Sequence, residues 1–351
     1  MTLIFFQNCI SPHQIPYIRE CAKDKRIQKV FLCVPRTDYE KRLSMGWDSR
    51  KLLIGKDIIC LVHPLEEQIK VILLTEKDCF CFFSGIRADA YVFQWFKCSL
   101  SFRVKRYIIT EPPFIYNKPL WMHYVRFFIQ DYRFVKYIDG IFGFGQAAVD
   151  YYRNISSHWK VFPFQYVTEH VARTIPVPQG KLKLLFVGSL SHRKNVKIAL
   201  KALQGIDNVE FNIVGDGEKK TELKKMAKCL EIRSNFIGMK LMHEIPIIMQ
   251  QNDVLILPSL HDGWGAVVNE AMTLGLYVIV SDSCGAKVLI TDDEKGLVFK
   301  NNIRTDLKEK LSLCISHKET IRDNIERRIS LSKSIQGSQV ATYFVDCLVK
   351  E

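Results

Sequence analysis

Short apolar runs alternate with amphipathic stretches along most of this chain, and glycine, proline or polar residues separate them. Apolar runs of about five residues predict buried strands, and apolar residues three or four positions apart predict helices. In the first half, this pattern predicts strands at 2–8, 29–34, 57–62, 70–74, 79–83, 107–110 and 140–144. It predicts helices from the Ser11–Pro12 start signal to about Lys25, and at 87–100, 121–137 and 146–153.

The segment 164–181 holds prolines and a glycine without clear periodicity, so we expect a linker between two domains there. Beyond it the alternation restarts, with strands expected at 182–187, 209–214, 235–237, 253–257, 277–280, 285–290 and 297–299. Helices are expected at 194–203, from Gly217 to about Leu230, at 242–250 and at 266–274, and two or three more finish the chain. This alternation predicts an α/β fold with a largely parallel sheet in each half. Two such Rossmann-like units hold ligands in a cleft at the carboxyl ends of their strands.

Length and composition narrow the class of protein. A chain of 351 residues can build two domains, and 48% hydrophobic with 25% charged residues is typical of a globular protein. No apolar run reaches the roughly eighteen residues of a spanning helix, and residues 2–8 are expected as a first strand rather than a signal peptide. The eleven cysteines form no metal-binding pattern, so we expect a reduced, cytoplasmic protein without a structural metal.

The net charge is +13, and +9 of it lies before residue 174. A basic surface suits an anionic partner such as membrane lipid, a phosphorylated acceptor or nucleic acid, although a generically basic protein is the alternative. No nucleic-acid motif is present, so we expect no nucleic-acid partner. The expected helix at 121–137 mixes aromatic with basic residues. It is either a helix on an anionic membrane surface or one that is half-buried against its sheet.

The stretch Leu255–Ala271 carries the clearest chemistry. An apolar run ends at Pro258, a loop with Gly263 and Gly265 follows, and a helix is expected next. Free backbone N–H groups at a helix start suit a phosphate, and glycines permit its close approach. Asp262 and Glu270 are positioned for sugar hydroxyls on either side of that phosphate. The alternative is an ordinary turn, in which Asp262 caps the helix and Glu270 is solvated.

Two more loops follow predicted strands in the same half, at 188–195 and 215–218. All three loops should open on one edge of a parallel sheet. The first supplies Arg193 and Lys194, whose charges suit a diphosphate unless they only begin a solvated helix. Together the three loops predict a site for a nucleoside diphosphate.

Six segments in this half occur in the order and spacing of one family: 186–190 with 193–195, 213–218, 236–238, 253–259, 262–271 and 278–282. The second half therefore resembles the retaining family-4 glycosyltransferases of the GT-B fold, and the first half resembles them more loosely. The resemblance implies two Rossmann-like domains that face each other across a cleft. It implies an acceptor domain at 1–170, a donor domain at 181–334, and a C-terminal helix at about 335–351 that packs back on the first domain.

By position, the resemblance implies that Lys194 and Arg193 neutralise the donor diphosphate and that Glu270 holds the ribose. Asp262 stands where the family has the first glutamate of a glutamate pair, and it would lie by the donor sugar. Donor-binding positions are implied at Gly188, Ser189, Asn195, Gly215, Gly238, Met239, Gly263, Trp264, Gly265, Ala266 and Val267. The Gly238–Met239 backbone would meet the base, and the backbone from Trp264 to Val267 would meet the β-phosphate or sugar. The sequence departs from the family in two places, because Asp262 is shorter than glutamate and Ser189 replaces a frequent arginine.

The first half offers weaker candidates. His13 follows the first predicted strand and is a catalytic candidate that could contact acceptor or donor, or it is a local hydrogen-bonding group. Glu111 follows another strand and is an acceptor-side candidate, or an ordinary residue before a proline. Trp264 is expected to pack beneath its loop rather than to stack on sugar.

These features predict a retaining glycosyltransferase that moves a sugar from a nucleotide-diphosphate sugar to an acceptor hydroxyl. The chain has no Asp-x-Asp pair, so we expect no metal and no cofactor besides the co-substrate. The expected acceptor is a glycan or a lipid-linked molecule in polysaccharide or glycolipid synthesis, reached from the cytoplasm at the inner face of the membrane. Two alternatives remain open: a GT-B nucleotide-sugar epimerase and a non-catalytic nucleotide-sugar-binding protein.

Overall fold

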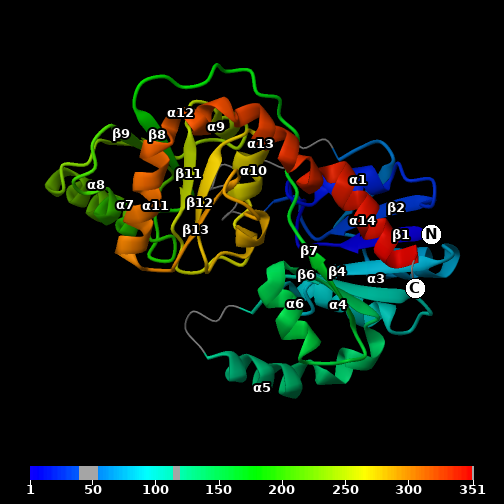
Figure 1. Ribbon diagram of the computed structural model, residues 1–351. Helices are drawn as coiled ribbons and strands as arrows, with labels where there is room; N and C mark the ends of the chain where they lie inside the picture. The colour runs from blue at the N-terminus through cyan, green and yellow to red at the C-terminus, as the bar shows by residue number, and fades with distance from the viewer. Residues whose placement is uncertain (39–53, 114–118, 350–351) are drawn as a thin grey trace. The chain divides into compact units, whose positions relative to one another are not determined.

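The computed structural model describes residues 1–38, 54–113 and 119–349, and these form two compact units. The first unit contains the described residues up to Glu169 together with those from Ile335 onward. The second unit contains His170–Ser334. Each unit is built on one sheet in which every strand pairing is parallel (Figure 1).

The first sheet has the strand order β3-β2-β1-β4-β5-β6-β7. Its strands are β1 (Thr2–Phe6), β2 (Lys29–Val34), β3 (Ile58–Val62), β4 (Cys79–Ser84), β5 (Lys105–Thr110), β6 (Gly140–Phe144) and β7 (Lys160–Phe164). The helices of this unit are α1 (Ile15–Cys21), α3 (Glu66–Thr75), α4 (Ala90–Ser99), α5 (Leu120–Gln130), the 3-10 helix η2 (Tyr132–Tyr137), α6 (Gly145–Arg153) and α14 (Gly337–Val349).

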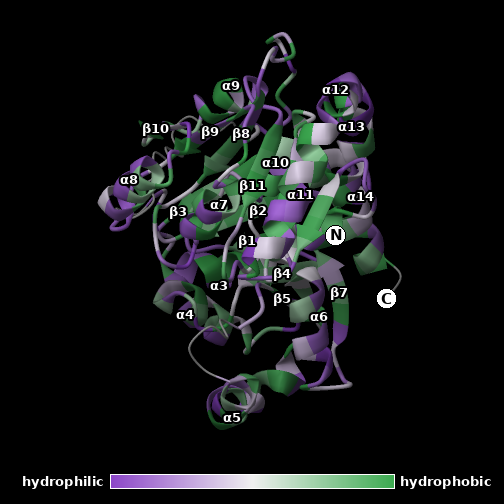
Figure 2. Cartoon of the chain, turned by 60° about the vertical axis from the view of Figure 1, so that its left-hand side comes forward, coloured by the Kyte–Doolittle hydropathy of each residue, from purple (hydrophilic) through white to green (hydrophobic). Residues whose placement is uncertain are grey.

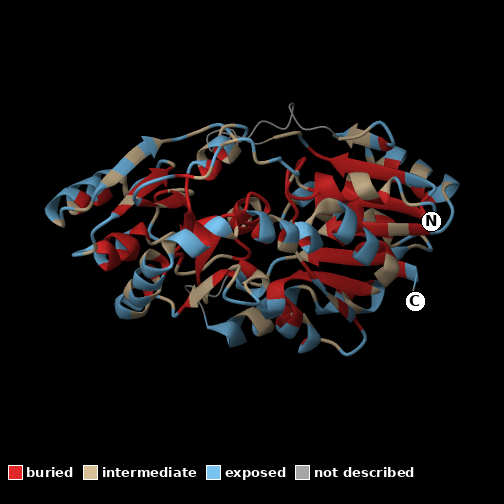
Figure 3. Cartoon of the chain, turned by 45° about the horizontal axis from the view of Figure 1, so that its top comes forward, coloured by how far each residue is buried: buried red, intermediate tan, exposed pale blue. Residues whose placement is uncertain are grey.

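Both faces of this sheet are buried because neighbouring residues of its central strand are apolar and point to opposite sides. Phe6 stacks on Phe83 and meets Trp95 of α4 on one face. Phe5 faces the other way and stacks on Phe82 and on Phe344 of α14. Figure 3 shows the strands mostly as buried, and Figure 2 shows them as hydrophobic.

Helix α14 belongs to this unit although it comes from the far end of the chain, and it lies beside α1 (Figure 1). Phe344 is completely buried, and its ring lies within 5.8 Å of the rings of Phe5, Tyr17, Phe82, Phe142 and Phe164. Asp346 of α14 also pairs with Arg26 at 2.6 Å. The core on this face of the first sheet is therefore completed by α14. Residues 350–351 of the expected terminal helix lie outside the described residues.

Two predictions for this unit were wrong, and one strand was not predicted. Residues 70–74 are helical, within α3, because Ile69 and Leu73 point inward one turn apart. Residues 160–164 form strand β7, to which no element was assigned; Pro163 weakens the strand pattern, but an edge strand tolerates a missing N–H. The expected helix at 121–137 is two helices, α5 and η2, with Asp131 between them.

The second sheet has the order β10-β9-β8-β11-β12-β13. Its strands are β8 (Leu182–Val187), β9 (Val209–Val214), β10 (Ser234–Gly238), β11 (Val254–Leu257), β12 (Tyr277–Ser281) and β13 (Gly296–Phe299). Its helices are α7 (Val196–Leu203), α8 (Lys220–Cys229), α9 (Ile245–Gln250), α10 (Val267–Thr273), the 3-10 helix η3 (Gly285–Leu289), α11 (Arg304–Ser316), α12 (Lys318–Asp323), α13 (Ile325–Leu331) and the 3-10 helix η4 (Ser332–Ile335). The strand expected at 285–290 is thus wrong, since this segment is η3.

A buried ion pair fixes the amino edge of the second sheet. Arg322 donates from Nε and Nη2 to the two carboxylate oxygens of Asp253, both at 3.0 Å, and both side chains are almost fully buried. Asp253 also accepts the backbone N–H of Lys183 at 2.8 Å. The pair therefore joins α12 to the starts of β11 and β8. None of the described helices is long and apolar enough to cross a membrane.

We expect Phe344→Ala to destabilise the first unit by about 3–5 kcal/mol, because it leaves a cavity among five aromatic rings. The matched control is Tyr343→Ala, since Tyr343 lies next in the chain and is 41% exposed. Urea unfolding followed by tryptophan fluorescence measures both variants. Equal losses of stability for the two variants would contradict the assignment of α14 to this core.

Candidate functional site

Three loops of the second unit meet at the carboxyl edge of its sheet. They follow β8, β9 and β11, and β8 lies between the other two strands. The backbone N–H of Leu190 in the first loop bonds to the carbonyl of Asp216 in the second at 2.8 Å. The N–H of Leu260 in the third loop bonds to the carbonyl of Arg193 at 2.8 Å. The loops therefore form one connected surface.

An ion-paired group lies at the centre of this surface. Lys194 Nζ is 2.6 Å from Asp262 Oδ2, and both side chains are close to 90% buried. Arg193 Nη1 lies 3.4 Å from the same oxygen and donates to the carbonyl of His261 at 2.9 Å. Burial by itself would raise the pKa of Asp262, but the charges of Lys194 and Arg193 outweigh it and hold that pKa below its usual value. Asp262 is therefore ionised at neutral pH.

Two glycines allow these loops to come close together. Gly215 has a φ of +132°, and a Cβ placed on it would lie 1.9 Å from the carbonyl oxygen of Gly188. Gly265 has a φ of +96°, and its Cβ would lie 2.7 Å from a methyl group of Leu257. A larger residue at either position would push the loops apart. Gly188 also has a positive φ, +153°, so the backbone favours glycine at all three predicted turn positions.

Trp264 and the loop after β12 support the loop that carries Asp262. Trp264 is 1% exposed, and its ring N–H donates to Asn269 of α10 at 2.7 Å, so its side chain packs beneath the loop as expected. The loop after β12, which the sequence interpretation did not include, supports it from the side. The N–H of Gly285 bonds to the carbonyl of Asp262, and that of Ala286 bonds to the carbonyl of Trp264. A Cβ on Gly285 would lie 2.2 Å from the carbonyl oxygen of Gly263.

Helix α10 begins directly after this loop, at Val267 rather than Ala266, and carries Glu270. Glu270 is half-buried, and burial raises its pKa to about 7. The two acids of the stretch therefore differ in charge state: Asp262 is ionised by its cations, and Glu270 holds its proton up to neutral pH. An acid of this kind can donate or accept a hydrogen bond, which suits a sugar hydroxyl.

The remaining predicted positions lie around these loops. Asn195 precedes α7 with a φ of 50°, so the helix begins at Val196 rather than at Lys194. The Ser189 hydroxyl lies 3.4 Å from that of Ser191. Gly238 ends β10, and its carbonyl accepts the N–H of Gly215 at 2.8 Å, which brings the expected base-binding backbone next to the second loop. Met239, which follows it, is 51% exposed.

A second cluster lies at the carboxyl edge of the first sheet. The hydroxyl of Tyr166 donates to Glu111 Oε1 at 2.8 Å, and its ring lies 5.8 Å from that of His13. The N–H of Val167 bonds to the carbonyl of His13 at 3.0 Å, and Phe144 stacks on Tyr166 at 4.2 Å. The structure thus brings Arg193, Lys194 and Asp262 together in the second unit, and it places Glu111 and His13 beside Tyr166 in the first. Tyr166, which joins His13 to Glu111, was missed because β7 was not predicted.

Among the described residues, no group of three or more His, Cys, Asp or Glu side chains could hold a metal ion. The charged residues predicted for the site in the second unit are two cations, Arg193 and Lys194, and two acids, Asp262 and Glu270.

Comparison with known proteins finds a family match in the second half of the chain. Residues 168–330 match the family described as glycosyl transferases group 1. This match spans nearly all of the second unit. An uncharacterised glycosyltransferase of Methanocaldococcus jannaschii is 29% identical over 164 residues, which are 44% of this chain and 45% of the relative. An α-1,4-N-acetyl-D-galactosaminyltransferase of Campylobacter jejuni is 29% identical over 163 residues, 45% of each chain. The chain thus spans less than half the length of these curated relatives.

Solved structures are also similar to this chain over its whole length. The lipopolysaccharide outer core galactosyltransferase WaaB has a TM-score of 0.74 at 14% identity, and the match covers 100% of this chain and 99% of WaaB. HepE of Anabaena, solved in complex with UDP, has a TM-score of 0.72 at 14% identity and full coverage of both chains. At this identity the likeness establishes the fold. The predicted GT-B fold, with two Rossmann-like parallel-sheet domains, is confirmed.

Replacing Glu270 with Gln removes a carboxyl group whose pKa rises from 4.5 to about 7 on folding. Because the folded state holds this proton more tightly, stability falls as pH rises from about 4.5 to 7 and stays lower above that range. We expect Glu270→Gln to be more stable than the wild type by about 2 kcal/mol near pH 8 and equally stable near pH 4.

Urea unfolding of the ligand-free protein at both pH values measures this difference. The control is Glu309→Gln, whose side chain is 67% exposed, and it should change little at either pH. A gain for Glu270→Gln that is equal at both pH values would disprove the pKa assignment.

Proposed function

We propose that this protein is a retaining, metal-independent glycosyltransferase that moves a sugar from a nucleotide-diphosphate sugar to an acceptor hydroxyl. The observation that carries the proposal is the arrangement of Arg193, Lys194 and Asp262 on two hydrogen-bonded loops within the segment that matches glycosyl transferases group 1. Two cations face one carboxylate there, so the group keeps a net positive charge for a diphosphate. The relatives' names describe glycosyl transfer, which supports the same reaction class.

In this proposal the donor diphosphate binds Lys194 and Arg193, and Asp262 then contacts the donor sugar. Glu270 holds the ribose hydroxyls. The bond between the anomeric carbon and the phosphate oxygen breaks, and the acceptor oxygen bonds to the same face of the sugar. The acceptor proton passes to the leaving phosphate. The cations stabilise the charge that develops on that phosphate, which is the function a metal ion serves in other enzymes.

We place the acceptor at the first unit, where Tyr166, Glu111 and His13 form a polar cluster with an aromatic ring. Such a mixture suits a sugar or a glycan, because the ring covers an apolar sugar face and the carboxylate accepts its hydroxyls. Relatives from Campylobacter jejuni and Escherichia coli are named for acceptors carried on diphosphoundecaprenol. A glycan or lipid-linked acceptor, in polysaccharide or glycolipid synthesis, is the class we propose for this chain.

A lipid-linked acceptor requires contact with a membrane, and α5 with η2 offers a surface for it. The inner side of α5 packs through Phe127 on Trp159 and through Tyr124 on Tyr151. The exposed apolar residues of α5 are Leu120, Trp121, Met122, Val125, Phe128 and Ile129, and Tyr132 at the start of η2 is exposed as well. Hydrophobic patches are visible on α5 in Figure 2.

Basic residues lie on the same two helices, at Arg126, Arg133 and Lys136, and all three are exposed. Apolar side chains flanked by cations suit the interface of an anionic bilayer. We propose that this surface holds the protein peripherally on an anionic membrane.

We expect Lys194→Met to lower kcat/KM for sugar transfer by about 100- to 1000-fold, because the developing phosphate charge loses its most buried cation. The matched control is Lys197→Met in the first turn of α7, where the side chain is 48% exposed and pairs with Glu222. Lys197→Met should keep its activity. Unchanged turnover in Lys194→Met would remove Lys194 from the site.

Product analysis with a panel of nucleotide sugars tests the reaction class itself. The anomeric configuration of the product by NMR should match that of the donor, and added EDTA should leave the rate unchanged. Conversion of the nucleotide sugar without acceptor would favour the epimerase. Tight binding without turnover of any donor and acceptor pair would favour the non-catalytic binding protein.

Vesicles of phosphatidylcholine and phosphatidylglycerol test the membrane surface. We expect the protein to sediment with them, and Ile129→Glu or Trp121→Glu to reduce binding at least about tenfold, because each change places a carboxylate in the apolar layer. Ile129 is 78% exposed, so the fold should tolerate the change. Leu74→Glu on α3, at a position that is 72% exposed, is the control and should bind like the wild type. Binding that is insensitive to both α5 variants would disprove the proposal.

A further inference from the structure

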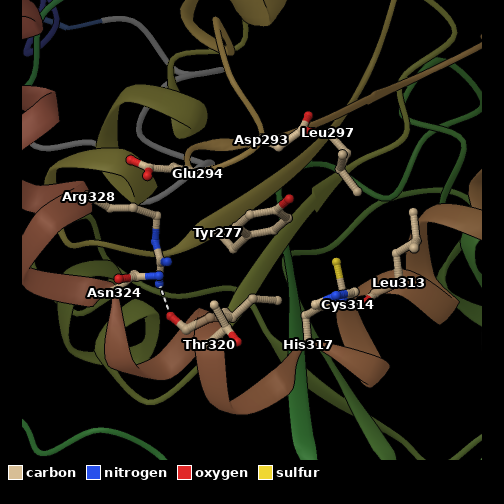
Figure 4. Close-up of a pocket in the computed structure, with 11 residues that line it drawn as sticks. Tyr277, Asp293, Glu294, Leu297, Leu313, Cys314, His317, Thr320, Asn324 and Arg328 are labelled. Carbon is tan, nitrogen blue, oxygen red and sulfur yellow. Dashed lines mark hydrogen bonds between the residues drawn. The ribbon is translucent and has the colours of Figure 1, made fainter.

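The second unit has a cavity at the opposite edge of its sheet from the three loops. Its volume is about 420 Å³, within the range of small-molecule sites. Tyr277, the first residue of β12, and Leu297 of β13 form its floor. Residues of α11, α12 and α13 form its walls (Figure 4). Because it lies at the amino edge of the strands, this cavity is separate from the proposed donor site.

The lining is apolar over most of its extent. Leu297, Leu313, Cys314 and Ile321 contribute aliphatic or sulfur atoms, and Tyr277 contributes its ring. In Figure 4 these side chains surround a common space, with Leu313 and Cys314 on one side and Arg328 on the other. A ligand with an apolar body would bury that body here.

Arg328 brings a positive charge into this apolar setting. It is only 4% exposed, and its guanidinium donates from Nε to the carbonyl of Gly275 at 2.8 Å and from Nη2 to the carbonyl of Ile321. Within the part of the chain that the structure describes, no carboxylate lies within ion-pair distance of it. Arg322, by contrast, is equally buried and is paired with Asp253. A buried cation that lacks a counter-charge is costly, and an anionic ligand would supply one.

Two acidic residues of the lining limit the charge of that anion. Asp293 and Glu294 both line the cavity, and Glu294 pairs at 2.7 Å with Arg327, which is not part of the lining. Two carboxylates in the lining repel a phosphate or another multiply charged group. They oppose a single carboxylate on an apolar body much less.

We propose that this cavity binds a small organic monocarboxylate, with its carboxylate on Arg328 and its alkyl or aryl body against Tyr277, Leu297 and Leu313. The site belongs to the second unit alone and does not depend on the proposed sugar transfer. It is a second ligand site on the unit that carries the three loops.

Calorimetric titration of the full chain tests this site with a series of alkyl and aryl carboxylates, each paired with the alcohol of the same body. We expect at least one acid of the series, such as 3-phenylpropanoate, to bind about tenfold or more tightly than its alcohol, because a hydrogen bond to a charged group is worth roughly 1.5–3 kcal/mol. Arg328→Met should remove this preference. Arg327→Met is the matched control, since Arg327 is 63% exposed and outside the cavity, and it should keep the preference.

A second variant, Leu313→Trp, tests the site without removing Arg328, in case Arg328→Met fails to fold. Leu313 is 40% exposed, and a larger side chain there fills the cavity from its open side. This variant should unfold at the wild-type temperature and bind no acid. The proposal is overturned if no acid of the series binds, if acids and alcohols bind alike, or if binding survives Leu313→Trp. None of these outcomes depends on whether the protein transfers sugar.

Discussion

The ion pair between Lys194 and Asp262 is the contact on which the proposed donor site depends. It joins residues 68 positions apart, and this is possible because β8 and β11 are adjacent parallel strands whose following loops emerge at the same edge. Desolvation of both groups is costly, and Arg193 offsets part of that cost by adding a second cation to the same carboxylate. The result is a group with surplus positive charge that is already positioned before any ligand arrives.

The same constraint of parallel strands explains the first unit. His13 follows β1, Glu111 follows β5 and Tyr166 follows β7, so all three side chains start from the carboxyl edge of one sheet. What differs is the chemistry at that edge. The first unit offers a ring, a carboxylate and an imidazole, whereas the second offers cations and close backbone. The two edges thus differ as the donor and acceptor sites of the proposed transfer reaction would.

Most of the second unit could be predicted from sequence, because its strands are continuous apolar runs and its glycines stand where the backbone needs them, as at Gly215 and Gly265. The sequence could not reveal that Lys194 and Asp262 contact each other, since loop pairing depends on strand order. It also missed the support that Gly285 gives to the Asp262 loop, because a glycine that only avoids a clash carries no local pattern. In the first unit, Pro163 interrupts the strand pattern, so β7 was not predicted and Tyr166 after it was missed. Residues 70–74 form an apolar run that fits a strand and a helix equally well.

The position of Phe344 has a consequence for how the protein is made. Chain synthesis runs from the amino end, and domains generally fold as they emerge from the ribosome. The residues of the second unit, 170–334, are all translated before α14. One face of the core of the first unit therefore stays uncovered until α14 has been synthesised. The unit that is synthesised first is therefore completed last, and during translation its aromatic surface around Phe82 and Phe142 stays open to chaperones or to aggregation.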